Sequence, residues 1–186
     1  MRDELIAKVL AHGFDRAAWI SADQIVLDRS FRAQCASNAC GLYGRCYMCP
    51  PDVGDIDTLM AELRGYHRGI LYQSVCPLED SFDFEGMQAG GKLHSKRSHA
   101  LDSALREAGM DGFLHLSKGG CGVCAVCAKT EGKPCAFPQK ALSSLEAYGV
   151  HVSATAKNAA LPYINGVNTV TYFGLILFKE NASCSD

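Results

Sequence analysis

The sequence predicts an α/β or α+β fold in which helices cover a small central sheet of about four strands. Three observations indicate this fold class. Helix-like and strand-like segments roughly alternate along the chain, its 186 residues are enough for one hydrophobic core, and 48% of them are hydrophobic. No linker rich in glycine, proline or serine interrupts this pattern, so we expect residues 1–186 to form a single domain.

The first predicted elements are a helix and a strand. Residues 4–11 have the composition of a short helix, which Gly13 ends. A strand is expected at 17–21, and a first cysteine-rich loop then occupies residues 35–52. This loop is the first candidate for a functional site.

A helix, a strand and a loop follow. Asp55 is a suitable N-cap, because an aspartate side chain accepts hydrogen bonds from the first N–H groups of a helix. The helix after it places its apolar residues on one face: Ile56, Leu59, Met60 and Leu63. Residues 68–75 alternate and are rich in β-forming types, which predicts a strand. The polar, glycine-containing residues 78–91 predict a loop.

The middle of the chain is predicted to contain a long helix and a short strand. Residues 92–108 are apolar at helical spacing, and Gly109 closes this helix. A short strand is expected at 112–116. It leads directly into a second cysteine-rich loop.

The last part of the chain is predicted to contain two helices and a strand. Residues 139–148 have an apolar stripe at helical spacing and are followed by Gly149. Ser153 is expected to cap a final helix that ends before Pro162. Residues 168–178 are the most apolar strand candidate, so we expect this strand at the centre of the sheet.

Composition and charge exclude several classes of function. The formal net charge of −2, from 18 basic and 20 acidic residues, excludes a broad electrostatic grip on nucleic acid or on an anionic membrane. The longest strongly apolar run, 173–178, is far shorter than the ~20 residues of a membrane span. The first residues alternate charged with apolar types and lack the apolar stretch of a signal peptide, so we expect a cytoplasmic protein.

Ten cysteines are several times the usual share, and eight of them form two tight groups. The first group contains Cys35, Cys40, Cys46 and Cys49, and the second contains Cys121, Cys124, Cys127 and Cys135. Disulfides are rare in a reducing cytoplasm, and scattered core thiols would not segregate into two sets of four. We therefore predict that all eight bind metal, while Cys76 and Cys184 stand alone.

The spacing of the second group favours an iron–sulfur cluster over zinc. Two successive gaps of two residues place three thiolates on one tight loop, which is the bacterial ferredoxin arrangement, whereas zinc usually takes two separated pairs. Glycines between the ligands leave the backbone free to approach the cluster. Because the gap before Cys135 is seven residues rather than three, Cys135 ligates either the same cluster or another site.

The first group is less diagnostic. Its two pairs of cysteines fit either a zinc knuckle or a second cubane cluster. Basic residues near the two groups would offset the negative charge of a thiolate-bound cluster, or are ordinary solvated side chains. They are Arg45, Lys118, Lys129 and Lys133.

Several motifs together resemble a known family. They are Cys35-x4-Cys40-Gly-x-Tyr43-Gly44, Cys46-x2-Cys49-Pro-Pro, Gly119-Gly120-Cys121-x2-Cys124-x2-Cys127, Cys135-x2-Pro138, Glu146-Ala-Tyr-Gly149 and the closing run 168–175. In these the chain resembles the Cys-rich predicted metal-binding proteins, domain of unknown function 2284. The resemblance implies metal binding by the eight grouped cysteines and no established reaction.

Other polar residues have two interpretations each. The basic stretch Lys92, His94, Lys96, Arg97 and His99 is either a solvated helix face or a docking patch for an acidic redox partner or an anionic substrate. His115 is either a hydrogen-bonded sheet histidine or a proton donor near a cluster. Cys76 is a buried bystander, a ninth ligand or a reactive thiol.

The leading hypothesis is an electron-transfer module that holds one or two [4Fe–4S] clusters and docks with a redox partner protein. A cubane with four thiolate ligands has no open iron site, so it exchanges single electrons rather than binding a substrate. Two alternatives stay open. One is an enzyme whose cluster keeps one iron free for a small anionic substrate, and the other is a zinc-stabilised interaction module.

Overall fold

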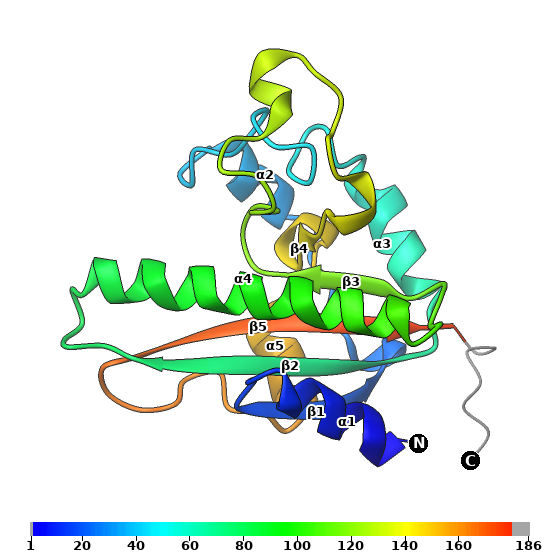
Figure 1. Ribbon diagram of the computed structural model, residues 1–186, viewed down its shortest axis with the longest axis vertical. Coiled ribbons are helices and arrows are strands. Elements are labelled where there is room, and N and C mark those ends of the chain that lie inside the picture. Colours follow the sequence, from blue (N-terminus) through cyan, green and yellow to red (C-terminus); the bar gives the residue numbers. More distant parts are fainter. Residues whose placement is uncertain (1, 180–186) are drawn as a thin grey trace.

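The computed structural model describes residues 2–179 and has a mixed sheet of five strands at its centre (Figure 1). The strands are β1 (Arg16–Ser21), β2 (Arg68–Pro77), β3 (Leu114–Ser117), β4 (Ser143–Ser144) and β5 (Thr169–Phe178), in the order β1-β2-β5-β3-β4 across the sheet. Neighbouring strands are antiparallel except β3 and β4, which are parallel. The predicted fold class is confirmed as α+β, with one strand more than expected.

Five α-helices accompany the sheet. They are α1 (Arg2–Ala11), α2 (Phe31–Ala36), α3 (Ile56–Arg64), α4 (Phe84–Glu107) and α5 (Val152–Asn158). Short 3-10 helices lie in the connections: η1 (Ala22–Gln24), η2 (Ala128–Glu131), η3 (Pro138–Lys140) and η4 (Glu146–Tyr148). Helices α1 and α4 pack on one face of the sheet, and α3 and α5 on the other (Figure 1). Within residues 2–179, none of the helices combines the length and apolarity needed to cross a membrane.

Side-chain alternation in the two central strands builds a hydrophobic core on each face of the sheet. On β2, Ile70 and Tyr72 pack with α1 and α4, while Leu71 between them packs with α3 and α5. Strand β5 repeats this alternation over residues 175–177, and all of these side chains are fully buried. Because a fully buried aliphatic side chain contributes about 1.5–3 kcal/mol, these two strands hold the helices on both sides.

Most elements lie where the sequence predicts them. The Asp55 carboxylate caps α3, as expected, and accepts hydrogen bonds from the backbone N–H groups of Asp57 and Thr58. Strand β5 lies between β2 and β3, in the middle of the sheet, as its apolar composition predicts. The strand expected at 112–116 is observed as β3, which starts two residues later and ends one residue later.

The loop expected over 78–91 is wrong in its second half, because α4 already begins at Phe84. The Asp83 carboxylate caps this helix and accepts a hydrogen bond from the backbone N–H of Gly86 at 2.7 Å. Three glycines follow the cap, at positions 86, 90 and 91. These glycines made the segment resemble a loop.

Two of these glycines are required by close packing rather than by a turn. A Cβ on Gly90 would lie 2.8 Å from the sulfur of Cys76, and a Cβ on Gly91 would lie 2.8 Å from the ammonium nitrogen of Lys118. Both glycines also face the ring of Tyr172 on β5, at 3.3 Å. The missing side chains therefore let α4 approach the sheet closely.

The helix expected over 139–148 is wrong. The segment forms η3, β4 and η4 instead, because β4 pairs with β3 and the backbone N–H of Leu145 donates to the carbonyl of Ser117 at 3.0 Å. The apolar residues that suggested a helix, Leu142, Leu145 and Tyr148, are nevertheless buried. Their spacing serves core packing without a helical backbone.

The final helix is confirmed as α5, but its N-cap is His151 rather than Ser153. Nδ1 of His151 accepts a hydrogen bond from the backbone N–H of Ala154 at 3.4 Å. The helix ends at Asn158, before Pro162 as expected. An imidazole thus replaces the hydroxyl that the sequence suggested as the capping group.

A buried chain of polar side chains ties α4 to the sheet. The Tyr72 hydroxyl lies 2.6 Å from Nε2 of His115 and donates to the Ser98 hydroxyl at 3.0 Å, and the Ser117 hydroxyl also donates to Ser98. Nδ1 of His115 lies 3.2 Å from the Asp102 carboxylate. With partners at both ring nitrogens, His115 fits the interpretation of a hydrogen-bonded sheet histidine.

Replacing Gly174 with alanine should destabilise the sheet. Gly174 pairs with Tyr72 across β5 and β2, and a Cβ there would lie 2.1 Å from the Tyr72 ring, which is fully buried and cannot move aside. We expect Gly174→Ala to lower the free energy of unfolding by about 1–3 kcal/mol, measured by urea denaturation. Val170→Ala, at the partly exposed start of the same strand, should have a smaller effect. Equal effects of the two changes would contradict this packing.

The stability of the protein should fall as the pH drops below about 6.5. The ring of His94 is buried beneath α4, stacks on Tyr72 and contacts the Ser74 hydroxyl at 2.9 Å. Burial, with nearby positive charge from Lys118, lowers the pKa of His94 to about 3. Between the two pKa values the unfolded chain binds a proton that the folded chain does not. Each unit by which the pH falls in this range therefore lowers the free energy of unfolding by about 1.4 kcal/mol.

Urea denaturation at pH 7 and pH 5 tests this dependence. The variant His94→Gln should lose less stability between the two pH values than the wild type does. Replacement of the exposed His67 by glutamine is the matched control and should leave the difference unchanged. If His94→Gln and the wild type respond equally to pH, burial of a neutral imidazole is not the cause.

Candidate metal centre

The two cysteine loops pack against each other beside the β3–β4 edge of the sheet. We call residues 35–52 and 119–141 together the Cys-rich region (Figure 1). The Tyr47 hydroxyl of the first loop donates to the Lys133 carbonyl of the second at 2.7 Å. Asp52 of the first loop forms an ion pair with Lys129 of the second. These contacts join segments that are distant in sequence.

The Cys-rich region encloses a small cavity of about 40 Å³ that is lined by five cysteines. They are Cys46, Cys121, Cys124, Cys127 and Cys135. All four cysteines of the second group therefore reach one cavity, joined by a single member of the first group. The remaining lining is mostly apolar and includes no histidine, aspartate or glutamate.

Cys46 connects the two groups. Its side chain is buried, and a hydrogen bond with the Cys49 thiol lowers the pKa of Cys46 to about 5. The backbone N–H of Cys121 and the thiol of Cys127 act in the same direction. The shared bond raises the pKa of Cys49. The shared hydrogen bond therefore favours the thiolate, the form that binds metal, at one of these two cysteines.

The other cysteines of the first group lie outside this cavity. Cys35 is half-buried on α2, Cys40 is exposed just after that helix, and Cys49 is buried. Burial raises the pKa of the Cys35 thiol, and Arg32 opposes this effect. Negative charge on Cys40 and on Cys35 would raise the pKa of Cys49 further. Both thiols are therefore close enough to Cys49 to interact with it electrostatically.

The donor set fits a thiophilic metal, although no single-ion site is preformed. Among residues 2–179, no group of three or more histidine, cysteine, aspartate or glutamate side chains is arranged to hold one metal ion. A tetrahedral zinc site gathers four thiolates around one ion at about 2.3 Å each, whereas the thiolates of a cubane bind four different irons and surround a larger volume. Five thiols line the apolar cavity of about 40 Å³, and thiolates are the ligand type that both kinds of site use.

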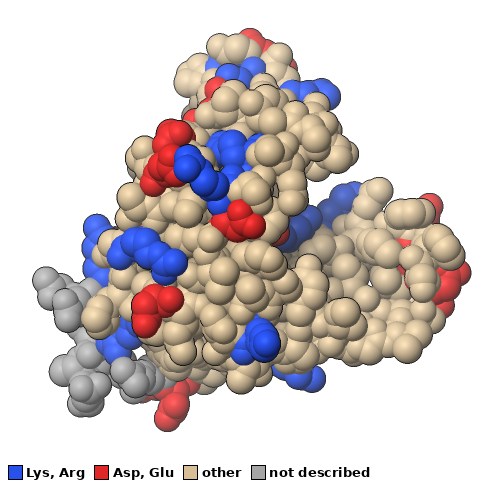
Figure 2. Space-filling view, turned by 180° about the vertical axis from the view of Figure 1, so that it is seen from behind, with Lys and Arg blue, Asp and Glu red and all other residues tan. Residues whose placement is uncertain are grey.

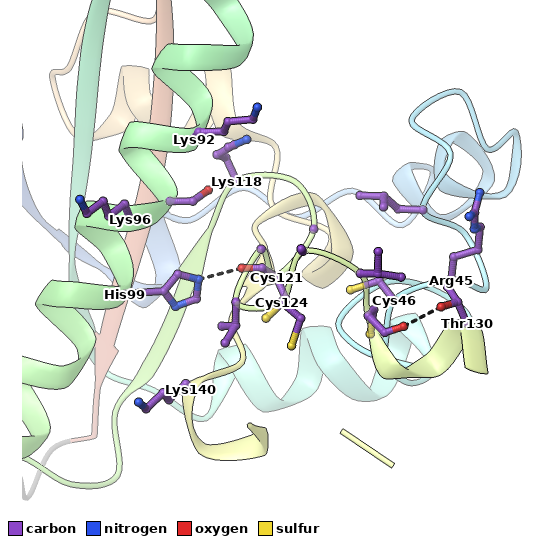
Figure 3. A pocket seen from close by; sticks show the side chains of 18 of the residues that line it. Arg45, Cys46, Lys92, Lys96, His99, Lys118, Cys121, Cys124, Thr130 and Lys140 are labelled. Atoms are coloured by element: carbon purple, nitrogen blue, oxygen red, sulfur yellow. Dashed lines mark hydrogen bonds between the residues drawn. The ribbon is translucent and has the colours of Figure 1, made fainter. Parts of the chain in front are cut away.

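A cleft of about 750 Å³ separates the Cys-rich region from α4. One wall carries Cys46, Cys121 and Cys124, together with Cys127, so four thiols line both the small cavity and this cleft (Figure 3). The other wall is the face of α4 that carries Lys92. Figure 2 shows the hollow between the two parts, with Lys or Arg side chains inside it.

His99 joins α4 to the second cysteine loop. Its Nε2 lies 2.7 Å from the backbone carbonyl of Cys121, and because a carbonyl only accepts, Nε2 carries the proton (Figure 3). Nδ1 of His99 is buried and has no hydrogen-bond partner among the described residues. The sequence assigned His99 only to a basic stretch. The signal that was missed is the spacing of 92, 96 and 99, which places these residues on one helix face.

Other singled-out residues have separate places. Cys76 is half-buried on β2 against Gly90 and lines neither the small cavity nor the cleft, and Cys184 lies outside the described residues. Of the basic residues near the loops, Lys129 and Lys133 are occupied by ion pairs, whereas Arg45 and Lys118 line the cleft.

Comparison with known proteins gives one match. A family model described as Predicted metal-binding protein (DUF2284) matches residues 18–178 of the chain, which include both cysteine groups. No match was found among curated proteins or among solved structures. The family resemblance seen in the cysteine motifs is thereby confirmed, as is metal binding in the coarse sense of the family description.

Breaking the contacts between the two loops should open the Cys-rich region. The double variant Tyr47→Phe/Asp52→Asn removes a hydrogen bond and an ion pair that join the loops. We expect trypsin to cleave after Lys129 several-fold faster than in the wild type, because local opening exposes the backbone. Mass spectrometry of timed digests measures this rate.

The matched control is Asp57→Asn, which breaks the exposed Arg29–Asp57 ion pair elsewhere on the surface. It should leave the cleavage rate unchanged. Unaltered cleavage in the double variant would mean that the loops do not depend on these contacts.

Proposed function

Because the chain belongs to the family of predicted metal-binding proteins (DUF2284), we propose that it is an iron–sulfur protein that transfers electrons. The observation that supports this most strongly is the convergence of five thiols from two loops on one cavity. The spacing of the second cysteine group, with two successive gaps of two residues, supports a cubane cluster over zinc.

The ligands proposed for the cluster are Cys121, Cys124, Cys127 and Cys46. These four side chains line both the small cavity and the cleft, whereas Cys135 lines only the cavity. The proposal therefore takes the fourth ligand from the first loop rather than from the long gap before Cys135. Cys35, Cys40 and Cys49 would then form a second, smaller set for another cluster.

A [4Fe–4S] cluster, when bound, supplies single-electron transfer at a potential set by its surroundings. The protein's own residues would control those surroundings. Met48, Val123 and Phe137 line the cavity and limit access of water. The backbone N–H groups of Val123 and Leu142 donate toward the sulfur of Cys121. The half-buried position of Cys124 and Cys127 supports close approach of a redox partner protein at the cleft.

Anaerobic purification followed by metal analysis tests the proposal. The wild type should carry about four irons per chain for one cubane or about eight for two, with broad absorbance at about 400 nm that bleaches on reduction. Cys46→Ser should lose most of this iron, because the cluster would lose its fourth thiolate. Cys135→Ser should retain it.

The matched control is Cys76→Ser, since this thiol lines neither the cavity nor the cleft. It should retain iron and absorbance. Stoichiometric zinc without iron in the wild type would contradict the iron–sulfur proposal. Loss of iron in Cys135→Ser but not in Cys46→Ser would contradict the ligand assignment alone.

A further inference from the structure

We propose that the cleft beside the cysteines binds a small anionic molecule with carboxylate or phosphate groups, held by Lys92 of α4 and Lys118 at the end of β3. This inference goes beyond the proposed electron transfer, because it assigns a ligand site to the space next to the thiols. It does not depend on which metal the thiols hold. Figure 3 shows Lys92, Lys118, Cys121 and Cys124 around this space.

The α4 wall of the cleft is a polar stripe at helical spacing. Residues at positions i, i+3, i+4 and i+7 lie on one face of a helix, and here they are Lys92, Ser95, Lys96 and His99. The opposite face of α4 carries Leu101 and Leu105 into the core and Ser98 into the buried polar chain. Three residues of the basic stretch, Lys92, Lys96 and His99, therefore line one wall of a cleft.

Lys118 is held in position without an acidic partner. Its ammonium group lies 5.5 Å from the centre of the Tyr172 ring and occupies the space that a side chain on Gly91 would fill. The residue is half-buried, and burial lowers its pKa. A partly desolvated cation without a carboxylate gains most from an anionic ligand.

Among the described residues, no carboxylate balances the positive charge of the lysine and arginine side chains in the cleft. Five cations line it: Arg45, Lys92, Lys96, Lys118 and Lys140. None of them forms an ion pair with a carboxylate in the described part of the chain. The one acidic lining residue, Asp102, is already occupied by Arg106 at 2.7 Å and by His115 at 3.2 Å. The excess is local, since the whole chain has a net charge of −2.

The shape of the site favours a small molecule. Its volume of about 750 Å³ falls within the roughly 300–1,000 Å³ that is usual for small-molecule sites. Figure 2 shows Lys or Arg side chains inside a hollow between two parts of the molecule. The competing explanation, that these cations only offset the charge of a thiolate-bound metal, predicts no affinity for added anions.

Isothermal titration calorimetry with inorganic pyrophosphate and with succinate tests the inference. The anaerobically purified protein is titrated in low-salt buffer without phosphate, and the two probes distinguish phosphate from carboxylate recognition. We expect at least one of them to bind once per chain with Kd of about 1 mM or tighter. Lys92→Gln and Lys118→Met should each weaken this binding about tenfold or more.

Two further variants complete the test. Gly91→Ala keeps every charge but displaces the Lys118 ammonium group, so it should also weaken binding. Lys157→Gln removes an exposed lysine on α5, across the sheet from the cleft, and should bind like the wild type. Because Lys92 is exposed, its variant stays informative if a buried change impairs folding.

The inference is overturned if neither probe binds, or if Lys92→Gln and Lys157→Gln bind equally well. Metal content is measured on each sample, which separates this result from the proposed function. A protein without iron that still binds the anion through Lys92 would contradict the cluster and support the cleft. A protein with iron that binds no anion would support the cluster and contradict the anion site.

Discussion

The parallel pairing of two short strands, β3 and β4, holds both ends of the second cysteine loop at one edge of the sheet. The first loop has no such anchor of its own in the sheet among residues 2–179. Two contacts join it to the second loop. Tyr47 contacts Lys133, 86 positions away in sequence, and Asp52 contacts Lys129, 77 positions away. These contacts accompany the approach of Cys46 of the first loop to the four thiols of the second, which the sheet edge holds in place.

Helix α4 has two roles that its two faces keep apart. One face carries Leu101 and Leu105 into the core and contributes to the buried polar chain under the helix. The other face supplies Lys92, Lys96 and His99 to the cleft. Because the first face is fixed by packing and hydrogen bonds, the second is a rigid wall. The cleft therefore has lysine side chains from a fixed helix on one side and cysteine sulfur on the other.

Local sequence patterns were sufficient where the forces that form an element act within a few residues. The Asp55 cap and the apolar face of α3, and the apolar run of β5, are of this kind. Local patterns failed where contacts between residues distant in sequence determine the element. Glycines at 90 and 91 look like loop residues until the sheet is packed against them. The apolar spacing over 142–148 looks helical until β4 pairs with β3.

For the site, the sequence by itself determined the chemistry of the donors: eight thiols in two groups, spaced for metal rather than for disulfides. Thiols that are close in sequence project from the same part of a loop, and all four thiols of the second group line one cavity. Only the tertiary structure decided that Cys46, while bonded to Cys49, also joins that cavity, and that the cations of α4 line the neighbouring cleft. The reason is physical, since the distance between two loops is set by the packing of residues far apart in the chain.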